Sequence, residues 1–213
     1  VLLFQAIVDH AKTPCYYEAL LRLECDQELQ SPKLFLKIAR EKNLYDLLLR
    51  SITNQITTLL KQHPQMRIGI NFSLEDILNT ERLTFLKQAL AGYPVIFEIQ
   101  ADTPMLDPKI LAIIETLKKD GFGVALDNVS ETSLVETLKE GSVDYVKMHG
   151  DIIRNLLLNA NAKEQCNTLL NHCHNKKLKT VATYINAQST LEAVQALPFD
   201  LFQGYSFEQP HLL

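Results

Sequence analysis

Short apolar runs alternate with longer amphipathic stretches along the whole chain. The short runs are rich in β-branched residues, which is typical of strands, whereas the longer stretches repeat apolar positions at helical spacing. Two helices have a clear start, because Ser31-Pro32 and Asp107-Pro108 each place a capping residue before a proline. Strands are predicted at Leu2–Val8, Tyr16–Leu23, Met66–Phe72, Val95–Ile99, Gly123–Val129, Tyr145–Met148, Lys179–Tyr184 and Leu201–Phe207.

The order of these elements predicts the fold class. Alternation of strands and helices favours parallel pairing, and eight strands favour a closed barrel. Too few residues separate the first two runs for a crossover helix, so we expect a hairpin-like pair that makes one strand antiparallel. An open doubly wound sheet is the main alternative, but the glycine-rich turn that usually follows its first strand is missing. We therefore predict an α/β fold, a modified TIM-type βα barrel with one antiparallel strand, formed by residues 1–213 as a single domain.

Composition narrows the class of protein. The 213 residues are 46% hydrophobic and 22% charged, which is ordinary for a globular domain. A formal net charge of −4 argues against direct nucleic-acid binding, which usually needs a basic surface. No apolar run could cross a membrane and the four cysteines lack framework spacing, so we expect a cytoplasmic domain with free thiols. Because the chain begins at Val1 in an apolar run, we expect a piece of a longer multidomain protein, which could be membrane-anchored.

Polar residues fall near the ends of six predicted strands. In a βα barrel the carboxyl ends of the strands form the rim at which ligands bind. Any one of these residues alone would be read as a solvated rim residue, but six in a row predict a site. They are Asn71, Glu98, Asp127, Lys147, Thr183 and Gln203, and Glu18 lies within an earlier strand.

Three carboxylates, those of Glu18, Glu98 and Asp127, lie in runs that otherwise read as buried. Converging buried carboxylates repel one another and are costly to desolvate, and a divalent cation would resolve both problems. With the Asn71 amide they offer only oxygen ligands, which suits Mg²⁺ or Mn²⁺.

Two cations, Arg22 and Lys147, could meet a phosphate near these acids. Arginine would bind through its planar fork and lysine as a point charge. The residues alone therefore predict a rim pocket for a phosphorylated ligand, with room for a metal ion.

Ordered motifs along the chain carry a family resemblance. Glu18-Ala19-Leu20-Leu21-Arg22 matches the E-A-L-L-R motif that names the EAL domains, and the chain resembles these cyclic di-GMP phosphodiesterases over essentially its whole length. Such domains are modified βα barrels with one antiparallel strand. The other matches are Phe4–Val8 to the opening Q-P-I-V, Ser31-Pro32 to S-P-x-x-F, Asn71-Phe72-Ser73 to N-x-S, Glu98-Ile99 to E-I-T-E, Asp127-Asn128 to D-D-F-G, Lys147 to K-I-D, and Gln203-Gly204-Tyr205 with Pro210 to the closing Q-G-Y.

The resemblance implies roles for individual residues. In the family a pair of divalent metal ions activates water against one phosphodiester of cyclic di-GMP. The set attributed to the first metal is present in full, as Glu18, Asn71, Glu98 and Asp127. The implied ligand-binding residues are those four together with Gln5, Arg22, Lys147, Gln203 and Pro210.

The departures from the family pattern are concentrated at positions that carry acids in the family. Thr183 stands where the acid linked to water activation is expected, and a threonine cannot accept a proton at neutral pH. We therefore expect no catalytic residue, no required cofactor and at most a single Mg²⁺ or Mn²⁺. The residues that replace family acids are Ala101, Asn128, His149, Thr183 and Asn186.

Three functions stay open at this point. The first is a non-catalytic cyclic di-GMP receptor, the signalling domain of a bacterial regulator. The alternative is a degenerate EAL scaffold that binds a protein partner and no nucleotide, and the lesser alternative is a very weak phosphodiesterase. Cyclic di-GMP, a protein partner, flanking domains and a second copy of the chain are the expected partners, without direct nucleic-acid binding.

Overall fold

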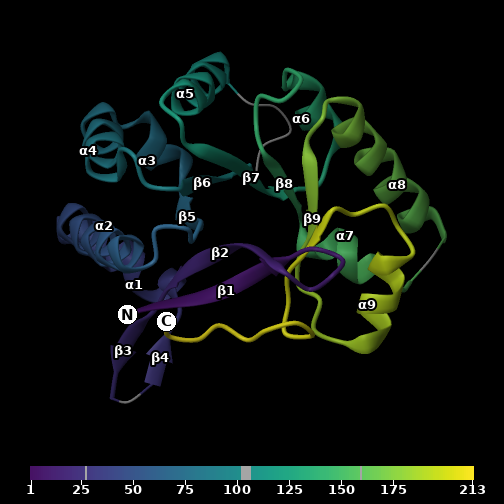
Figure 1. The fold of residues 1–213 in the computed structure, drawn as a ribbon, viewed down its shortest axis with the longest axis horizontal. Coiled ribbons are helices and arrows are strands. Elements are labelled where there is room, and N and C mark those ends of the chain that lie inside the picture. Colours follow the sequence, from purple (N-terminus) through teal and green to yellow (C-terminus); the bar gives the residue numbers. More distant parts are fainter. Residues whose placement is uncertain (27, 102–106, 159) are drawn as a thin grey trace.

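A closed barrel lies at the centre of the computed structural model, which describes residues 1–26, 28–101, 107–158 and 160–213. Going round the barrel, the strands are ordered β1-β10-β9-β8-β7-β6-β5-β2 (Figure 1). The predicted α/β barrel is confirmed. Its strands are β1 (Leu2–Val8), β2 (Pro14–Leu21), β5 (Ile68–Phe72), β6 (Val95–Gln100), β7 (Gly123–Val129), β8 (Tyr145–Met148), β9 (Lys179–Ala182) and β10 (Leu201–Phe202).

Strand β1 is the antiparallel member of the barrel. It pairs antiparallel with both β2 and β10, whereas the other neighbouring strands pair in parallel. The predicted hairpin-like start is therefore confirmed. Strand β10 ends at Phe202, earlier than predicted, and the chain that follows it returns to β1, where Phe4 and His211 form an antiparallel bridge.

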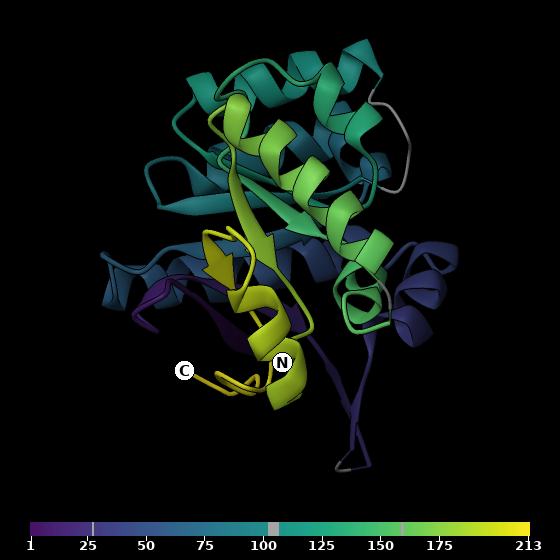
Figure 2. The ribbon, with the colours of Figure 1, turned by 90° about the vertical axis from the view of Figure 1, so that its right-hand side faces the viewer.

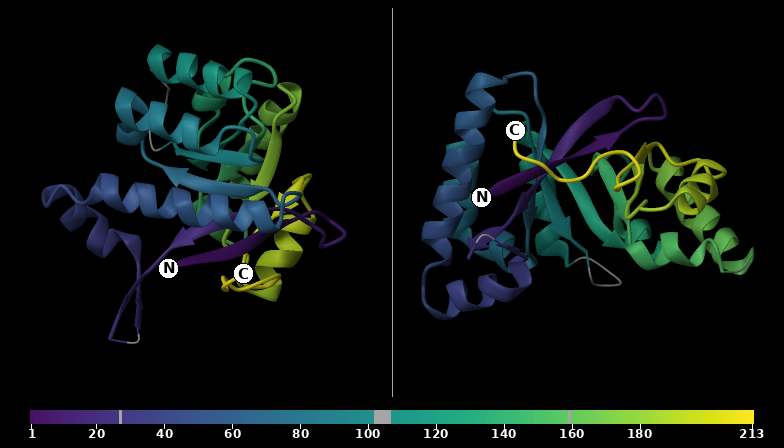
Figure 3. Two further views of the ribbon diagram at one scale, coloured as in Figure 1. Left: turned by 60° about the vertical axis from the view of Figure 1, so that its left-hand side comes forward. Right: turned by 90° about the horizontal axis from the view of Figure 1, so that it is seen from below.

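The helices surround the barrel, with the long helix α2 along its outside (Figures 1 and 3). Asp107 caps α5 as predicted, since its Oδ1 accepts a hydrogen bond of 2.7 Å from the Lys109 amide. The helices are α1 (Pro32–Glu41), α2 (Tyr45–Gln62), α3 (Leu74–Leu78), α4 (Thr80–Leu90), α5 (Pro108–Lys119), α6 (Thr132–Thr137), α7 (Gly150–Asn155), α8 (Ala160–Asn175) and α9 (Gln188–Gln195).

A two-stranded hairpin that the sequence did not predict separates β2 from α1. Its strands are β3 (Leu23–Cys25) and β4 (Glu28–Gln30), and it projects away from the barrel (Figure 2). The predicted second strand, Tyr16–Leu23, thus divides between β2 and β3, with Arg22 at the junction.

Two further predictions concerned free thiols and the lack of an apolar run that could cross a membrane. All four cysteines are free thiols, as expected. Within the described ranges, no helix combines the length and the apolar character needed to cross a membrane.

Two layers of inward-facing side chains fill the barrel. The lower layer is apolar and aromatic and includes Ile7, Tyr16, Ile96, Tyr145 and Val181. Because successive side chains on a strand alternate between faces, the residue two positions along each strand also points inward, one layer away. At the rim this second layer is polar, and it supplies the candidate site.

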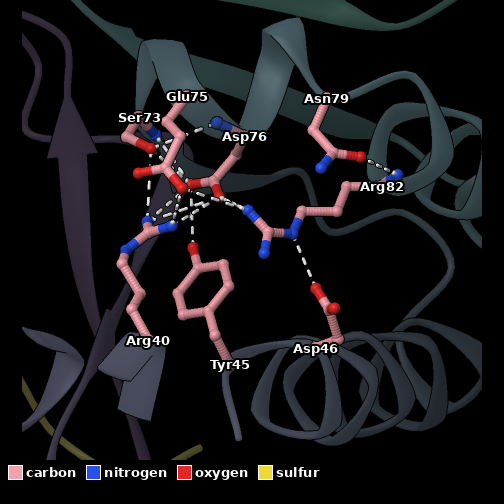
Figure 4. Close-up of polar contacts among 8 residues, drawn as sticks. All are labelled: Arg40, Tyr45, Asp46, Ser73, Glu75, Asp76, Asn79 and Arg82. Carbon is pink, nitrogen blue, oxygen red and sulfur yellow. Dashed lines mark hydrogen bonds and ion pairs between the residues drawn. The ribbon is translucent and has the colours of Figure 1, made fainter. Parts of the chain in front are cut away.

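Beside the rim, the buried carboxylate of Asp76 joins helices that precede β5 to helices that follow it (Figure 4). It accepts hydrogen bonds from Ser73 Oγ at 2.6 Å, Tyr45 OH at 2.8 Å and Arg40 at 3.3 Å. Arg82 of α4 approaches it at 3.4 Å. Helices α1, α2, α3 and α4 are thereby tied to the segment directly after Asn71.

Candidate functional site

A pocket of about 310 Å³ opens at the carboxyl-terminal rim of the barrel. Most of the predicted ligand-binding residues line it, but Asn71 and Glu98 do not. The lining residues are Gln5, Glu18, Leu20, Arg22, Asp127, Lys147, Thr183, Tyr184, Asn186, Gln203, Gly204, Tyr205 and Pro210.

Lys147 lies at the centre of the site and is almost completely buried, with 2% of its side chain exposed. Its Nζ donates to Glu18 Oε2 at 2.7 Å and to Glu98 Oε2 at 2.5 Å. Asp127 Oδ1 lies 4.0 Å away. Burial alone would lower the pKa of Lys147, but the three surrounding carboxylates outweigh burial and raise the pKa well above its usual value.

Glu18 is held by donors on β5, on β8 and directly after β10. Besides Lys147, Asn71 Nδ2 donates to Glu18 Oε1 at 2.6 Å and Gln203 Nε2 donates to Oε2 at 2.7 Å. Burial would raise the pKa of Glu18, but the charge of Lys147 and these hydrogen bonds outweigh it and lower the pKa. Glu18 is therefore ionised and its oxygens are well occupied.

Glu98 is in a different electrostatic state from Glu18, although both contact Lys147. Burial and the nearby charge of Glu18 raise its pKa to about 8, against the attraction of Lys147. Its side chain is fully buried and its Oε1 has no hydrogen-bond partner among the described residues. An unpartnered buried oxygen is costly, which favours the protonated form.

A chain of amides closes the pocket opposite β6. Gln203 Nε2 donates to Gln5 Oε1 at 3.1 Å, and Gln5 Nε2 donates to the carbonyl oxygen of Glu208 at 2.9 Å. Pro210 follows on the segment that pairs with β1. Residues from both ends of the chain thus form one wall.

The residues that were predicted to replace family acids have local structural contacts. Thr183 Oγ1 donates to the Met148 carbonyl at 2.8 Å, and Asn186 Oδ1 accepts from the Tyr205 amide at 3.0 Å. His149 does not line the pocket; its Nδ1 accepts from Asp151 N at 3.1 Å at the start of α7. Ala101 is buried, and Asn128 has a positive φ of 61° at an irregularity in the β7 pairing.

Six lining residues were not predicted as ligand-binding residues: Thr183 and Asn186, described above, and Leu20, Tyr184, Gly204 and Tyr205. Leu20 belongs to the motif on β2 and Gly204 to the closing motif, so their neighbours gave a signal. Tyr184 and Tyr205 have exposed fractions of 56% and 55%, and each presents an aromatic ring at the pocket. The sequence marks Tyr205 through the closing Q-G-Y motif, and it marks Tyr184 only as the last residue of a predicted strand.

The predicted metal ligands do not fit a divalent cation in this arrangement. Glu18, Asn71, Glu98 and Asp127 have the right chemistry, but the Lys147 ammonium bridges two of the carboxylates. Asn71 turns its amide nitrogen, a donor, towards Glu18. In the part of the chain that the structure describes, no group of three His, Cys, Asp or Glu residues is placed to hold a metal ion.

Comparison with known proteins gives a consistent family. The family model described as EAL domain matches residues 1–210. The cyclic di-GMP phosphodiesterase PdeF of Escherichia coli (strain K12) is 27% identical over 210 residues, which is 93% of this chain and 28% of PdeF. The probable cyclic di-GMP phosphodiesterase PdeA of the same strain is 24% identical, covering 100% of this chain and 31% of PdeA. The chain therefore spans less than a third of either relative.

Solved structures share the fold. The PaMucR phosphodiesterase in a c-di-GMP complex superposes with a TM-score of 0.83 at 23% identity, covering 99% of this chain and 91% of that one. The FimX EAL domain from Pseudomonas aeruginosa bound to c-di-GMP has a TM-score of 0.81 at 23% identity, covering 99% and 90%. At 23% identity, this structural similarity establishes that the chain shares the barrel fold.

Proposed function

This chain belongs to the EAL domain family, and from that premise we propose that it is a non-catalytic receptor for cyclic di-GMP. One observation carries the proposal: the rim pocket keeps its cations and amides, while every position that replaces a family acid is neutral or outside the pocket. Relatives named as cyclic di-GMP phosphodiesterases, and a neighbour structure in complex with c-di-GMP, support this choice of ligand.

The pocket offers complementary groups for a cyclic dinucleotide. Lys147 Nζ donates to Glu18 and Glu98 and lies 4.0 Å from Asp127, and it lines the pocket, where a phosphate oxygen can approach its charge. Arg22 lines the same pocket and adds a second cation. Tyr184 and Tyr205 expose rings on which a guanine base can stack.

The same pocket is poorly suited to hydrolysis. Attack on a phosphodiester needs an activated water, and a general base alone contributes roughly 10²–10⁴ in rate. Glu18 already accepts three hydrogen bonds, and the Thr183 hydroxyl donates a hydrogen bond to a backbone carbonyl. Asp127 is the other carboxylate among the described lining residues, and it lies in the field of Lys147.

Isothermal titration calorimetry with cyclic di-GMP tests the proposal. We expect saturable binding by the wild type and at least about tenfold weaker binding by Arg22→Met. Arg50→Met is the matched control, because Arg50 lies on α2 over the Phe85 ring, outside the rim pocket. No heat at about 100 μM ligand would exclude the receptor role.

Chromatography of long incubations with Mg²⁺ or Mn²⁺ tests the second half of the proposal. We expect cyclic di-GMP to remain intact while an active EAL phosphodiesterase linearises it under the same conditions. Linear dinucleotide produced by the wild type, and lost in Asp127→Asn, would identify the chain as a weak phosphodiesterase instead.

A protein-binding scaffold is the second candidate, and one surface favours it. Helix α1 has no fully buried residue, and Leu34, Ile38, Leu44 and Leu47 of α1 and its flank are more than half exposed. Exposed apolar patches of this kind often mark protein interfaces. A stoichiometric partner whose affinity is unchanged by cyclic di-GMP, together with silent calorimetry, would favour this role over the receptor.

A further inference from the structure

Gly69 forms a cradle for the carboxyl group of Glu98. The two residues lie on neighbouring strands β5 and β6, and both point into the barrel. A Cβ atom built on Gly69 would lie 2.3 Å from Glu98 Oε1 and 3.0 Å from Glu98 Cδ. Those distances are far inside van der Waals contact, so the carboxyl group occupies space that only a glycine leaves open.

Tyr16 forms the other side of this cradle. Its ring carbon Cε2 lies 3.1 Å from the same Cβ position at Gly69. The ring is 1% exposed and packs on Tyr145 with centroids 4.9 Å apart, so it is fixed in the lower layer of the barrel. Glu98 is therefore turned down into the barrel interior, which explains why it does not line the rim pocket.

This placement determines what lies between the acids. With Glu98 lowered, Lys147 Nζ reaches Glu18 and Glu98 at once, at 2.7 and 2.5 Å. An ammonium group hydrogen-bonded to both carboxylates fills the position that a bridging cation would need. Its positive charge is part of the protein, so no bound ion is required to balance the acids.

We propose that Gly69 and Tyr16 are positioning residues that hold Glu98 inside the barrel, and that the Lys147 ammonium thereby replaces a divalent ion as the resident cation of this site. The inference deepens the proposed function by naming the cation that meets the ligand's phosphate. Its test needs no nucleotide, so its failure is distinguishable from failure of cyclic di-GMP binding.

Titration of the protein with Mn²⁺ alone, followed by electron paramagnetic resonance of the free ion, gives the first test. We expect the wild type to take up no Mn²⁺ below about 100 μM. Lys147→Met removes the ammonium and leaves the acids uncompensated, so we expect its Mn²⁺ affinity to be at least about tenfold higher. Lys118→Met is the matched control, since Lys118 pairs with Asp144 at 2.6 Å away from the rim pocket and should leave Mn²⁺ uptake unchanged.

The wild-type titration decides the question even if Lys147→Met does not fold. Saturable, one-to-one Mn²⁺ uptake below about 100 μM that Glu98→Gln abolishes would overturn the proposal. Equal Mn²⁺ affinity of folded Lys147→Met and wild type would also overturn it. That result would show that the Lys147 ammonium does not keep a divalent ion out of the site.

A double-mutant cycle tests the cradle itself. Gly69→Ala should lower the urea midpoint of unfolding in the wild type, because the new methyl group meets Glu98 Oε1. In a Glu98→Ala background the same substitution should cause a smaller loss, since the obstructing carboxyl group is gone and the Tyr16 ring at 3.1 Å is the contact that remains. An equal loss of midpoint in both backgrounds would show that Gly69 does not position Glu98.

Discussion

At the scale of single residues, two buried glutamates that contact one lysine have pKa values shifted in opposite directions. Glu18 has three strong donors and a lowered pKa, whereas Glu98 has one donor, an unpartnered oxygen and a pKa raised to about 8. The difference follows from position, because Glu18 faces the amides of the rim and Glu98 faces the apolar interior. The site therefore divides its negative charge unequally.

The raised pKa of Glu98 predicts a pH dependence of stability. Between the ordinary value of 4.5 and about 8, folded protein retains a proton that the unfolded chain releases. This contribution is therefore fully present below pH 4.5 and is lost as the pH rises through about 8, at about 1.4 kcal/mol for each unit of pKa difference. Urea unfolding across this range should show the decline in the wild type and a flatter profile in Glu98→Gln.

Glu192→Gln, on the exposed side of α9, serves as the control and should keep the wild-type profile. If Glu98→Gln retained the same decline between these pH values, Glu98 would not be the group responsible.

Tyr16 gives a second prediction at this scale. Its hydroxyl is buried without a partner among the described residues, so Tyr16→Phe should raise the free energy of unfolding by about 1 kcal/mol. The comparison is Tyr145→Phe, which loses a hydrogen bond of 3.1 Å from Arg67 and should cost about 1 kcal/mol. Thermal or urea unfolding measures both, and a loss in Tyr16→Phe would point to an ordered water at the hydroxyl.

The sequence predicted which residues converge at the rim but not how they pair. Strand ends and motif matches singled out Glu18, Asp127, Lys147 and Gln203, and all four line the rim pocket. The direction of Glu98 depends on the absence of a side chain at Gly69, a residue more than twenty positions earlier on another strand. Periodicity predicts the face of a strand on which a residue lies. It does not predict how much space the neighbouring strand leaves beside that residue.

At the scale of elements, the Asp76 cluster holds helices that bury little themselves. Burial would raise the pKa of Asp76, but hydrogen bonds from Ser73, Tyr45 and Arg40 outweigh it and lower the pKa. Helix α1 has no fully buried side chain, so its Arg40 contact replaces the apolar packing that usually holds a helix. The cluster therefore controls the position of α1.

Asp76→Asn should lower the free energy of unfolding by about 2–3 kcal/mol at pH 7, because it removes the buried charge that accepts hydrogen bonds from Ser73, Tyr45 and Arg40. Since the folded pKa is lowered, this stabilisation is present above the ordinary value of 3.8 and is lost as the pH falls through the folded value. The difference between wild type and variant should therefore shrink in acid.

Asp46→Asn is the matched control for Asp76→Asn in urea unfolding. Asp46 also pairs with Arg82, at 2.6 Å, but its side chain is 65% exposed. Exposed ion pairs contribute little, so we expect a loss below about 1 kcal/mol. Equal losses in the two variants would contradict a special role for the buried carboxylate.

Elements with strong local patterns were the ones that the sequence predicted well. The amphipathic helix Pro108–Lys119 and the apolar strand Gly123–Val129 appear as expected. The β3–β4 hairpin was missed because its strands are short and exposed and have no buried face to give alternation. Strand β10 was predicted too long, since Gln203 to Phe207 is held by contacts with distant residues rather than by strand pairing.

At the scale of the whole molecule, ligand binding should stabilise the closed barrel. At a concentration of cyclic di-GMP about 100 times the Kd, mass action adds about 2.7 kcal/mol. For a domain of this size that corresponds to a rise in Tm of roughly 5–10 °C by scanning fluorimetry. GMP at the same concentration should give a smaller rise, and an equal rise in Arg22→Met would exclude Arg22 from the ligand contacts.

The wall shared by Gln5 and Gln203 has a consequence for biosynthesis. The hydrogen bond between them joins residues 198 positions apart, and Pro210 completes the pocket still later in the chain. A nascent chain can form helices and early strand pairs as it leaves the ribosome, but it has no complete pocket until Gln203 and Pro210 have emerged. The proposed nucleotide binding would therefore report closure of the barrel, and a nucleotide present in the cell would favour closed barrels over open ones.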